Sequence, residues 1–257
     1  MCKKKFLFLV MLFWSLSCDA AVLQQKFDVE LGFFDAAQME LVYEDNNKNF
    51  GISADVYTVH LFDTFYPFLG KYRSKGELKS GKAVPEIYQT YTKTRRHVRT
   101  KKILYDKDGF AYKRISIKDE RVREAAINNV PKSADAADLQ SVFADLMNII
   151  RQTGKCDLTR EIYDGKKHYK VVFTDKGTEK REFDYLKTKG EGKLCLMYVE
   201  NLINNNDNIL WDVSADKPIK IWLMQDKTTK IPYVMEIRID STPLGALKVV
   251  PTAVDIK

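Results

Sequence analysis

Histidine and cysteine are scarce in this chain, which has three and four of them among 257 residues. His60, His97 and His168 are far apart in the sequence, and none has a second ligand at the spacing of a metal site. The chain also lacks Gly-x-Ser-x-Gly, His-Glu-x-x-His, Gly-x-Gly-x-x-Gly and the P-loop, which mark many hydrolases, zinc peptidases and nucleotide-binding enzymes. We therefore expect a protein with no enzymatic activity, no bound metal and no cofactor.

Long apolar runs are missing except near the start of the chain. Lys3, Lys4 and Lys5 precede an apolar run from Phe6 to Leu16, and small residues follow. This order is typical of a secretory signal, and the run is shorter than the ~20 residues that a membrane span needs. We interpret residues 1–20 as a signal peptide and expect residues 21–257 to be exported to the periplasm.

The cysteines support two separate predictions. Ser15-Leu16-Ser17-Cys18 resembles a bacterial lipoprotein box, although Ser15 stands where a large aliphatic residue is usual. Two interpretations stand: cleavage after Ala20, or lipid attachment at Cys18, which would anchor the protein to a membrane. After the signal only Cys156 and Cys195 remain, and an isolated pair in an oxidising compartment usually bonds. We expect a structural disulfide between them.

The body of the chain has the patterns of a mainly β protein. Phe50–Val56 and Tyr233–Asp240 alternate apolar with polar or small residues, and a period of two marks a half-buried antiparallel strand. Turn signals such as Asp106-Lys107-Asp108-Gly109 separate runs of this kind at hairpin spacing. We expect eleven to thirteen strands, mostly joined as a meander.

One segment has the period of a helix. Apolar residues recur at Leu139, Val142, Phe143 and Leu146, Asp138 can cap the first turn, and Gly154 is a natural stop. The sequence therefore predicts a packed helix over 138–152. The charged, alanine-rich segment before it, 119–137, is interpreted as a linker. Residues 21–257 then form a single domain, with β halves at 26–118 and 159–250.

Positive charge is in modest excess, with a net value of about +5 after removal of the signal. The most basic stretch runs from Lys93 to Lys102 and contains four further cations. It is interpreted either as a patch for phosphate, lipopolysaccharide or an anionic bilayer, or as a solvated turn and an edge strand that charge protects against aggregation. Nucleic-acid binding is not expected of an exported chain with no recognised module for it.

Aromatic residues gather between two predicted strands. Phe65, Tyr66 and Phe68 lie within four positions of one another. They are interpreted either as lining the mouth of an apolar pocket or as sealing one end of a β core.

Several short segments occur in a recognisable order and spacing. They are Tyr66-Pro67-Phe68, Arg73-Ser74-Lys75-Gly76, Asp138-Leu139-Gln140-Ser141, Tyr163-Asp164-Gly165-Lys166-Lys167, Ile221-Trp222-Leu223, Ile231-Pro232-Tyr233 and Thr242-Pro243-Leu244-Gly245. Together, from about Phe27 to Val250, they resemble the bacterial envelope family called domain of unknown function 3108.

The resemblance implies export and a strongly curved antiparallel sheet, a half-barrel, wrapped around a central helix. Cys156 and Cys195 lie where a subset of the family carries a cysteine pair. The resemblance implies no catalytic residues. Curved sheets of this kind are similar to periplasmic lipoprotein-carrier folds, but a likeness of fold does not define a function.

Two functional hypotheses follow. The first is a non-enzymatic cell-envelope protein whose concave apolar face binds a lipid, an acyl chain or a lipoprotein. The second is an interaction or scaffold module in envelope biogenesis, with a filled core and a functional outer surface. The expected partners are a lipid or acyl ligand or another envelope protein, with peripheral contact to a membrane. The sequence does not define an oligomeric state.

Overall fold

The structure is a computed structural model that describes residues 21–127, 136–163, 168–201 and 217–257. The strands of these residues form one sheet of fifteen, in the order β8-β7-β6-β5-β4-β3-β2-β1-β15-β14-β13-β12-β11-β10-β9. The strands of the N-terminal half are β1 (Ala21–Leu31), β2 (Phe34–Asp45), β3 (Asn49–Thr58), β4 (Phe68–Lys79), β5 (Lys82–Thr94), β6 (Val98–Tyr105), β7 (Ala111–Lys118) and β8 (Arg121–Ala126). The strands of the C-terminal half are β9 (Ala136–Ala137), β10 (Leu158–Tyr163), β11 (His168–Phe183), β12 (Thr188–Asn201), β13 (Ile219–Gln225), β14 (Pro232–Thr242) and β15 (Gly245–Ile256).

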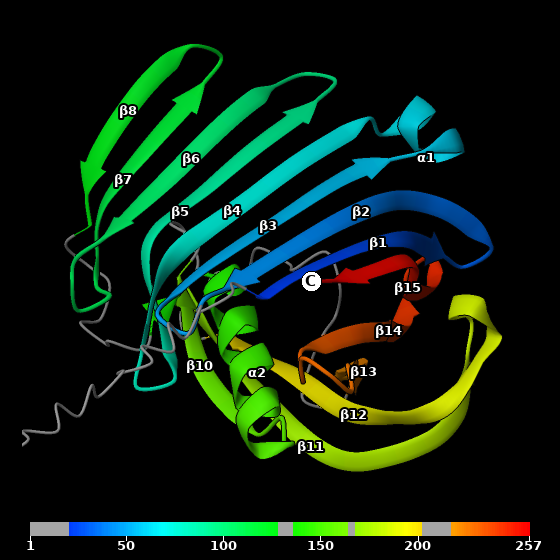
Figure 1. Ribbon diagram of the computed structural model, residues 1–257. Coiled ribbons are helices and arrows are strands. Elements are labelled where there is room, and N and C mark those ends of the chain that lie inside the picture. Colours follow the sequence, from blue (N-terminus) through cyan, green and yellow to red (C-terminus); the bar gives the residue numbers. More distant parts are fainter. Residues whose placement is uncertain (1–20, 128–135, 164–167, 202–216) are drawn as a thin grey trace, which may run out of the picture.

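The two halves meet at the antiparallel pair of β1 and β15, so the first and last strands lie side by side in the middle of the sheet. All neighbouring strands are antiparallel except β9 and β10. The sheet curves strongly without closing (Figure 1), and its edge strands are β8 and β9. The prediction of a mainly β, curved antiparallel sheet around a helix is confirmed, with more strands than expected.

The predicted linker 119–137 is wrong in part, because β8 occupies Arg121–Ala126 and pairs with β7 along its whole length. All six residues of β8 are exposed. An apolar alternation arises only when one face of a strand is buried, so the sequence of this edge strand has no such pattern. Its backbone pairing alone makes it a strand.

Helix α2 (Leu139–Thr153) confirms the predicted helix and its cap. The Asp138 carboxylate accepts a hydrogen bond from the Ser141 N–H at 3.0 Å, and the Ser74 hydroxyl of β4 donates to it at 2.9 Å. The helix ends at Gly154, whose φ of 69° favours glycine. α2 lies inside the curve of the sheet, in contact with β3, β4 and β5 on one side and with β10 and β14 on the other (Figure 1). Its apolar face, which includes Val142, Leu146 and Ile150, belongs to the main core.

A buried ion pair ties the two halves of the sheet to the helix. Arg160 of β10 places Nη1 2.7 Å from Oδ2 of Asp145 on α2, and both side chains are only 4% exposed. The other oxygen of Asp145 accepts a hydrogen bond from the backbone N–H of Ala83 on β5. One carboxylate thus joins a strand of each half to the helix between them.

This carboxylate gives the protein a predictable pH dependence. Burial raises the pKa of Asp145 to about 6, against the opposing attraction of Arg160. An unfolded aspartate has a pKa of about 3.9, so the folded state holds the proton more tightly. The stability that this provides is fully present below about pH 4 and is lost as the pH rises through about 6.

We expect the free energy of unfolding of the unsubstituted protein to fall over this range relative to that of Asp145→Asn. Denaturant titrations of both proteins between about pH 4 and pH 7 check this, and a difference that moves in the other direction would contradict it.

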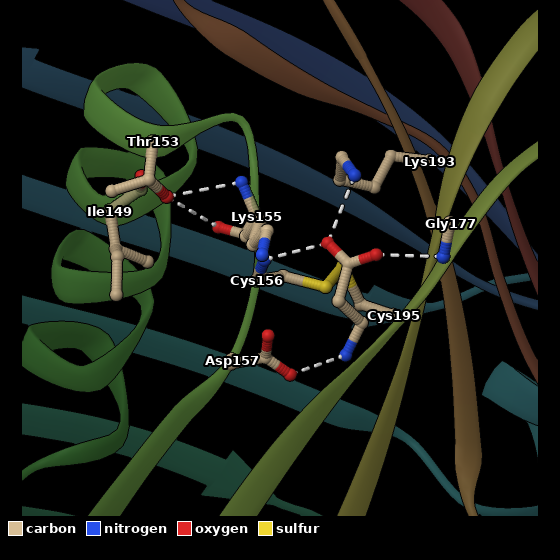
Figure 2. Close-up of a disulfide and its surroundings, with 9 residues drawn as sticks. Ile149, Thr153, Lys155, Cys156, Asp157, Gly177, Lys193 and Cys195 are labelled. Atoms are coloured by element: carbon tan, nitrogen blue, oxygen red, sulfur yellow. Dashed lines mark hydrogen bonds and ion pairs between the residues drawn. A yellow bond between two sulfur atoms is a disulfide. The ribbon is translucent and has the colours of Figure 1, made fainter.

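The predicted disulfide is confirmed. Cys156, just after α2, is bonded to Cys195 of β12 with an S–S distance of 2.08 Å, and both residues are fully buried. The Asp175 carboxylate accepts hydrogen bonds from the Cys156 and Gly177 N–H groups at 3.0 and 2.7 Å, and both of these donor residues are labelled in Figure 2. Burial would raise the pKa of Asp175, but these bonds and the Lys193 ammonium hold that pKa below its usual value. The disulfide and this carboxylate fix the end of the helix to the C-terminal half.

Candidate ligand-binding groove

A groove of about 1000 Å³ lies on the face of β4 to β8 that is turned toward the inside of the curved sheet. Ser74 shows which face of the sheet this is. Its hydroxyl donates a hydrogen bond to Asp138, the residue that caps α2, and Ser74 is the cross-strand partner of Tyr88, which lines the groove. α2 covers the neighbouring part of the concave surface and stops short of this region (Figure 1). Among the described residues, the groove is therefore the part of the concave face that α2 leaves uncovered.

The side chains of the groove form cross-strand rows, because the register of β4 to β8 places them opposite one another. The outermost row contains Thr92, Arg99, Lys118 and Arg121. The second contains Tyr72, Thr90, Lys101, Ser116 and Arg123, and the third contains Tyr88, Arg114 and Ala125. Every one of these residues lines the groove.

The groove is strongly cationic. Its lining contains six cations, Arg99, Lys101, Arg114, Lys118, Arg121 and Arg123, and one carboxylate, Asp119. In the outermost row three of these cations are direct neighbours on adjacent strands, and like charges in that position destabilise a sheet. A bound anion would remove this repulsion.

Part of the cationic lining has no carboxylate partner among the described residues. Within the described ranges, no carboxylate forms an ion pair with Arg99, Arg121 or Arg123. Asp119 lies at the outer end, where the Val98 N–H and the His97 ring hold its pKa below the usual value. On the opposite face of the same strands, by contrast, Lys113 and Glu124 pair at 2.7 Å.

The inner end of the groove is aromatic. Tyr88 is buried with Ile103 and Tyr105 in a small cluster, and burial raises the pKa of the neighbouring Tyr72. Thr90 and Ser116 add hydroxyl groups between the aromatic and the cationic ends. Cations and hydroxyls bind phosphate or carboxylate groups well, and tyrosine faces accept apolar groups. The arrangement suits an anionic, partly apolar ligand.

We expected an apolar concave face, and this expectation is wrong for its open part. The apolar part of the concave face lies beneath α2, where Val142 and Ile150 pack on the sheet. The part of the concave face that α2 leaves uncovered carries the cations. The sequence pattern could not distinguish this part from the part under α2, because the strands of both alternate with a period of two.

The predicted pocket aromatics lie elsewhere. Phe65 ends helix α1 (His60–Phe65), Tyr66 follows it, and Phe68 begins β4. Phe65 and Tyr66 are exposed and Phe68 is half-buried, and none of the three lines the groove. Cys18 lies outside the described residues.

The predicted basic stretch is divided by the fold. Arg95 and Arg96 lie in the turn between β5 and β6, whereas Arg99 and Lys101 face the groove. Lys102 points to the opposite face of β6. The other four groove cations, which the sequence analysis missed, come from β7 and β8. In the sequence, these four cations show only as an alternation of polar residues, as in Arg121-x-Arg123. This pattern is easily taken for that of a solvent-exposed strand.

The described residues hold no group of three His, Cys, Asp or Glu side chains that could bind a metal ion. His60 and His97 are exposed. His168 is buried, and its Nε2 lies 2.8 Å from Oε2 of Glu161 on the next strand. Within the described ranges, no helix is long and apolar enough to cross a membrane.

The fold of this chain is an open, strongly curved sheet around one helix. It is similar to the fold of a β-barrel-like protein of known structure. The crystal structure of a β-barrel-like protein of domain of unknown function DUF1849 from Brucella abortus aligns with a TM-score of 0.51 over 92% of this chain and 98% of that one. The two sequences are 9% identical, so the likeness concerns the fold alone.

A family model identifies the chain more closely. The model described as protein of unknown function DUF3108 matches residues 26–248, and the chain belongs to this family. The resemblance found in the sequence is therefore confirmed. A search of curated proteins gave no match.

Proposed function

We propose that this protein is a non-enzymatic binding protein of the cell envelope that holds an anionic amphiphile, such as a lipid with a charged headgroup, in the groove between β4 and β8. The observation that carries the proposal is the outermost row, where Arg99, Lys118 and Arg121 lie on adjacent strands. The headgroup would lie among these cations and the apolar part along Tyr72 and Tyr88.

Export is supported by the disulfide, since such bonds persist in oxidising compartments. The predicted signal in residues 1–20 points the same way. An exported protein meets lipids at the membrane surfaces on either side of its compartment. An anionic amphiphile is therefore a ligand that the protein would encounter.

The proposal predicts charge-dependent binding. We expect lysophosphatidylglycerol, below its critical micelle concentration, to bind more tightly than lysophosphatidylcholine with the same acyl chain. Arg99→Glu should lower the affinity for the anionic lipid about 10- to 100-fold, because a hydrogen bond to a charged group contributes about 1.5–3 kcal/mol. Titration calorimetry measures both quantities.

Lys102→Glu is the matched control, because Lys102 is on the same strand as Arg99, with the opposite orientation. It makes the same charge change and should leave the affinity unchanged. If Arg99→Glu and Lys102→Glu lower the affinity for the anionic lipid equally, the net charge of the protein rather than the groove governs binding. Equal affinity for the two lipids would contradict the proposal.

The scaffold hypothesis remains as a second candidate because β8 is an exposed edge of the sheet. Such an edge offers unpaired backbone groups to a strand of another protein. A proline at Val122, which lies on β8, should weaken binding of a protein partner to this edge. Photo-crosslinking from β8 in intact cells would identify the partner.

A further inference from the structure

Six of the eleven exposed large hydrophobic side chains of the described residues lie at one end of the sheet. We call this set the aromatic rim: Phe33, Phe34, Leu61, Phe65, Tyr66 and Leu244. Phe33 lies at the tip of the β1–β2 turn and is fully exposed, and Leu244, in the β14–β15 turn, is 65% exposed. Soluble proteins seldom leave this many large apolar side chains together at one place.

The rim is continuous in space. The β1–β2 and β14–β15 turns touch, since a Cβ at Gly32 would lie 2.7 Å from the backbone oxygen of Leu244. Phe34, at the start of β2, meets Phe62 of α1 edge-to-face with ring centroids 6.4 Å apart. Arg95 of the β5–β6 turn then donates a hydrogen bond to the Thr64 carbonyl of α1 at 2.6 Å.

The apolar side chains stand on separate turns and a short helix, and none of them lines the groove. Protein partners generally bind in hollows or on flat faces, whereas side chains on protruding turns can each enter a soft interface independently. Aromatic residues and leucine are the residues that typically occupy the boundary between headgroups and acyl chains. The shape of the rim therefore favours a lipid bilayer over a folded protein.

The charges beside the rim indicate which bilayer it would meet. Asp35 and Asp63 lie among the apolar side chains. The β5–β6 turn at the same end carries the exposed Arg95 and Arg96, and the outermost cationic row of the groove begins just beyond it. Cations placed at the headgroup level attract anionic lipids. The rim and the mouth of the groove would thus face the same surface.

We propose that the aromatic rim docks the protein on an anionic lipid bilayer by inserting Phe33, Phe65 and Leu244 into the headgroup region. The inference rests on exposed side chains outside the groove, so it stands independently of the ligand proposed above. Docking in this orientation would place the groove next to a source or an acceptor of lipid.

Vesicle co-sedimentation tests the proposal. We expect the protein to sediment with vesicles that contain phosphatidylglycerol and phosphatidylcholine, and less with phosphatidylcholine alone. Phe33→Ser combined with Phe65→Ser should reduce the bound fraction at least about 10-fold, since burial of apolar area drives the insertion. Both side chains are exposed, so the fold should be retained. Val122→Ser is the control, because Val122 is as exposed as Phe65 but lies on β8, away from the rim.

A tryptophan reporter, Phe33→Trp, gives a second and independent measurement. Its emission should shift to shorter wavelength when vesicles that contain phosphatidylglycerol are added, and Lys102→Glu, on the face of β6 that is turned away from the groove, should leave the shift in place. Unchanged sedimentation of the double serine variant, or no emission shift, would overturn the proposal. So would a dimer in sedimentation velocity that the double variant abolishes, since the rim would then be a contact between two copies of the chain.

Discussion

Arg160→Ala should lower the free energy of unfolding at neutral pH by about 3–5 kcal/mol, since it leaves a buried carboxylate without its partner. Arg160 and Asp145 are both 4% exposed, and Asp145 also accepts a hydrogen bond from the Ala83 N–H. The change would weaken the contact among α2, β5 and β10 at once. Denaturant unfolding followed by circular dichroism measures the loss.

Two further variants separate the charge from the packing. Asp145→Leu combined with Arg160→Met should recover most of the loss, because well-packed apolar residues often replace a buried ion pair without cost. Arg73→Ala removes an ion pair with Asp55 in which Arg73 is 45% exposed, and it should cost less than about 1 kcal/mol. If Arg160→Ala costs no more than Arg73→Ala, the buried pair does not hold the halves together.

Loss of the Cys156–Cys195 disulfide should cost about 4 kcal/mol of stability. The bond closes a loop with a sequence separation of 39 residues, and the chain-entropy estimate for a loop of that size is about 4 kcal/mol at 25 °C. Cys156→Ala combined with Cys195→Ala removes the bond without leaving a buried thiol. Thermal and denaturant unfolding of this variant and of the unsubstituted protein measure the difference.

The same variant tests where the disulfide acts. Hydrogen exchange should become faster at the end of α2 and around Asp175, because the bond and the Asp175 carboxylate fix these segments together. Exchange on β4 to β8 should rise only as far as the loss of global stability requires. A rise in exchange that is no larger at the end of α2 than on β4 to β8 would contradict this assignment.

The sequence predicted the strands well wherever one face is buried. Phe50–Val56 and Tyr233–Asp240 show the alternation and lie in β3 and β14. The helix was equally clear, because its apolar spacing and Asp138 cap are local properties. β8 was missed because an edge strand exposed on both faces leaves no periodic signal.

The groove was harder to predict because it forms across strands. Arg99, Lys118 and Arg121 lie on three different strands, and only the register brings their side chains together. The basic stretch at 93–102 contains two of the six groove cations. The sequence alone did not decide whether this stretch is an anion-binding patch or a solvated turn and edge strand. Phe65 and Tyr66 attracted attention as pocket aromatics, and the same exposure now supports the proposed membrane contact.

Native mass spectrometry of the protein, isolated from the cells that make it, tests the proposed groove ligand most directly. The account predicts a bound species of lipid mass that carries an anionic headgroup, present on the unsubstituted protein and on Lys102→Glu and depleted on Arg99→Glu. A bare polypeptide, or a neutral lipid bound equally to all three proteins, would contradict it.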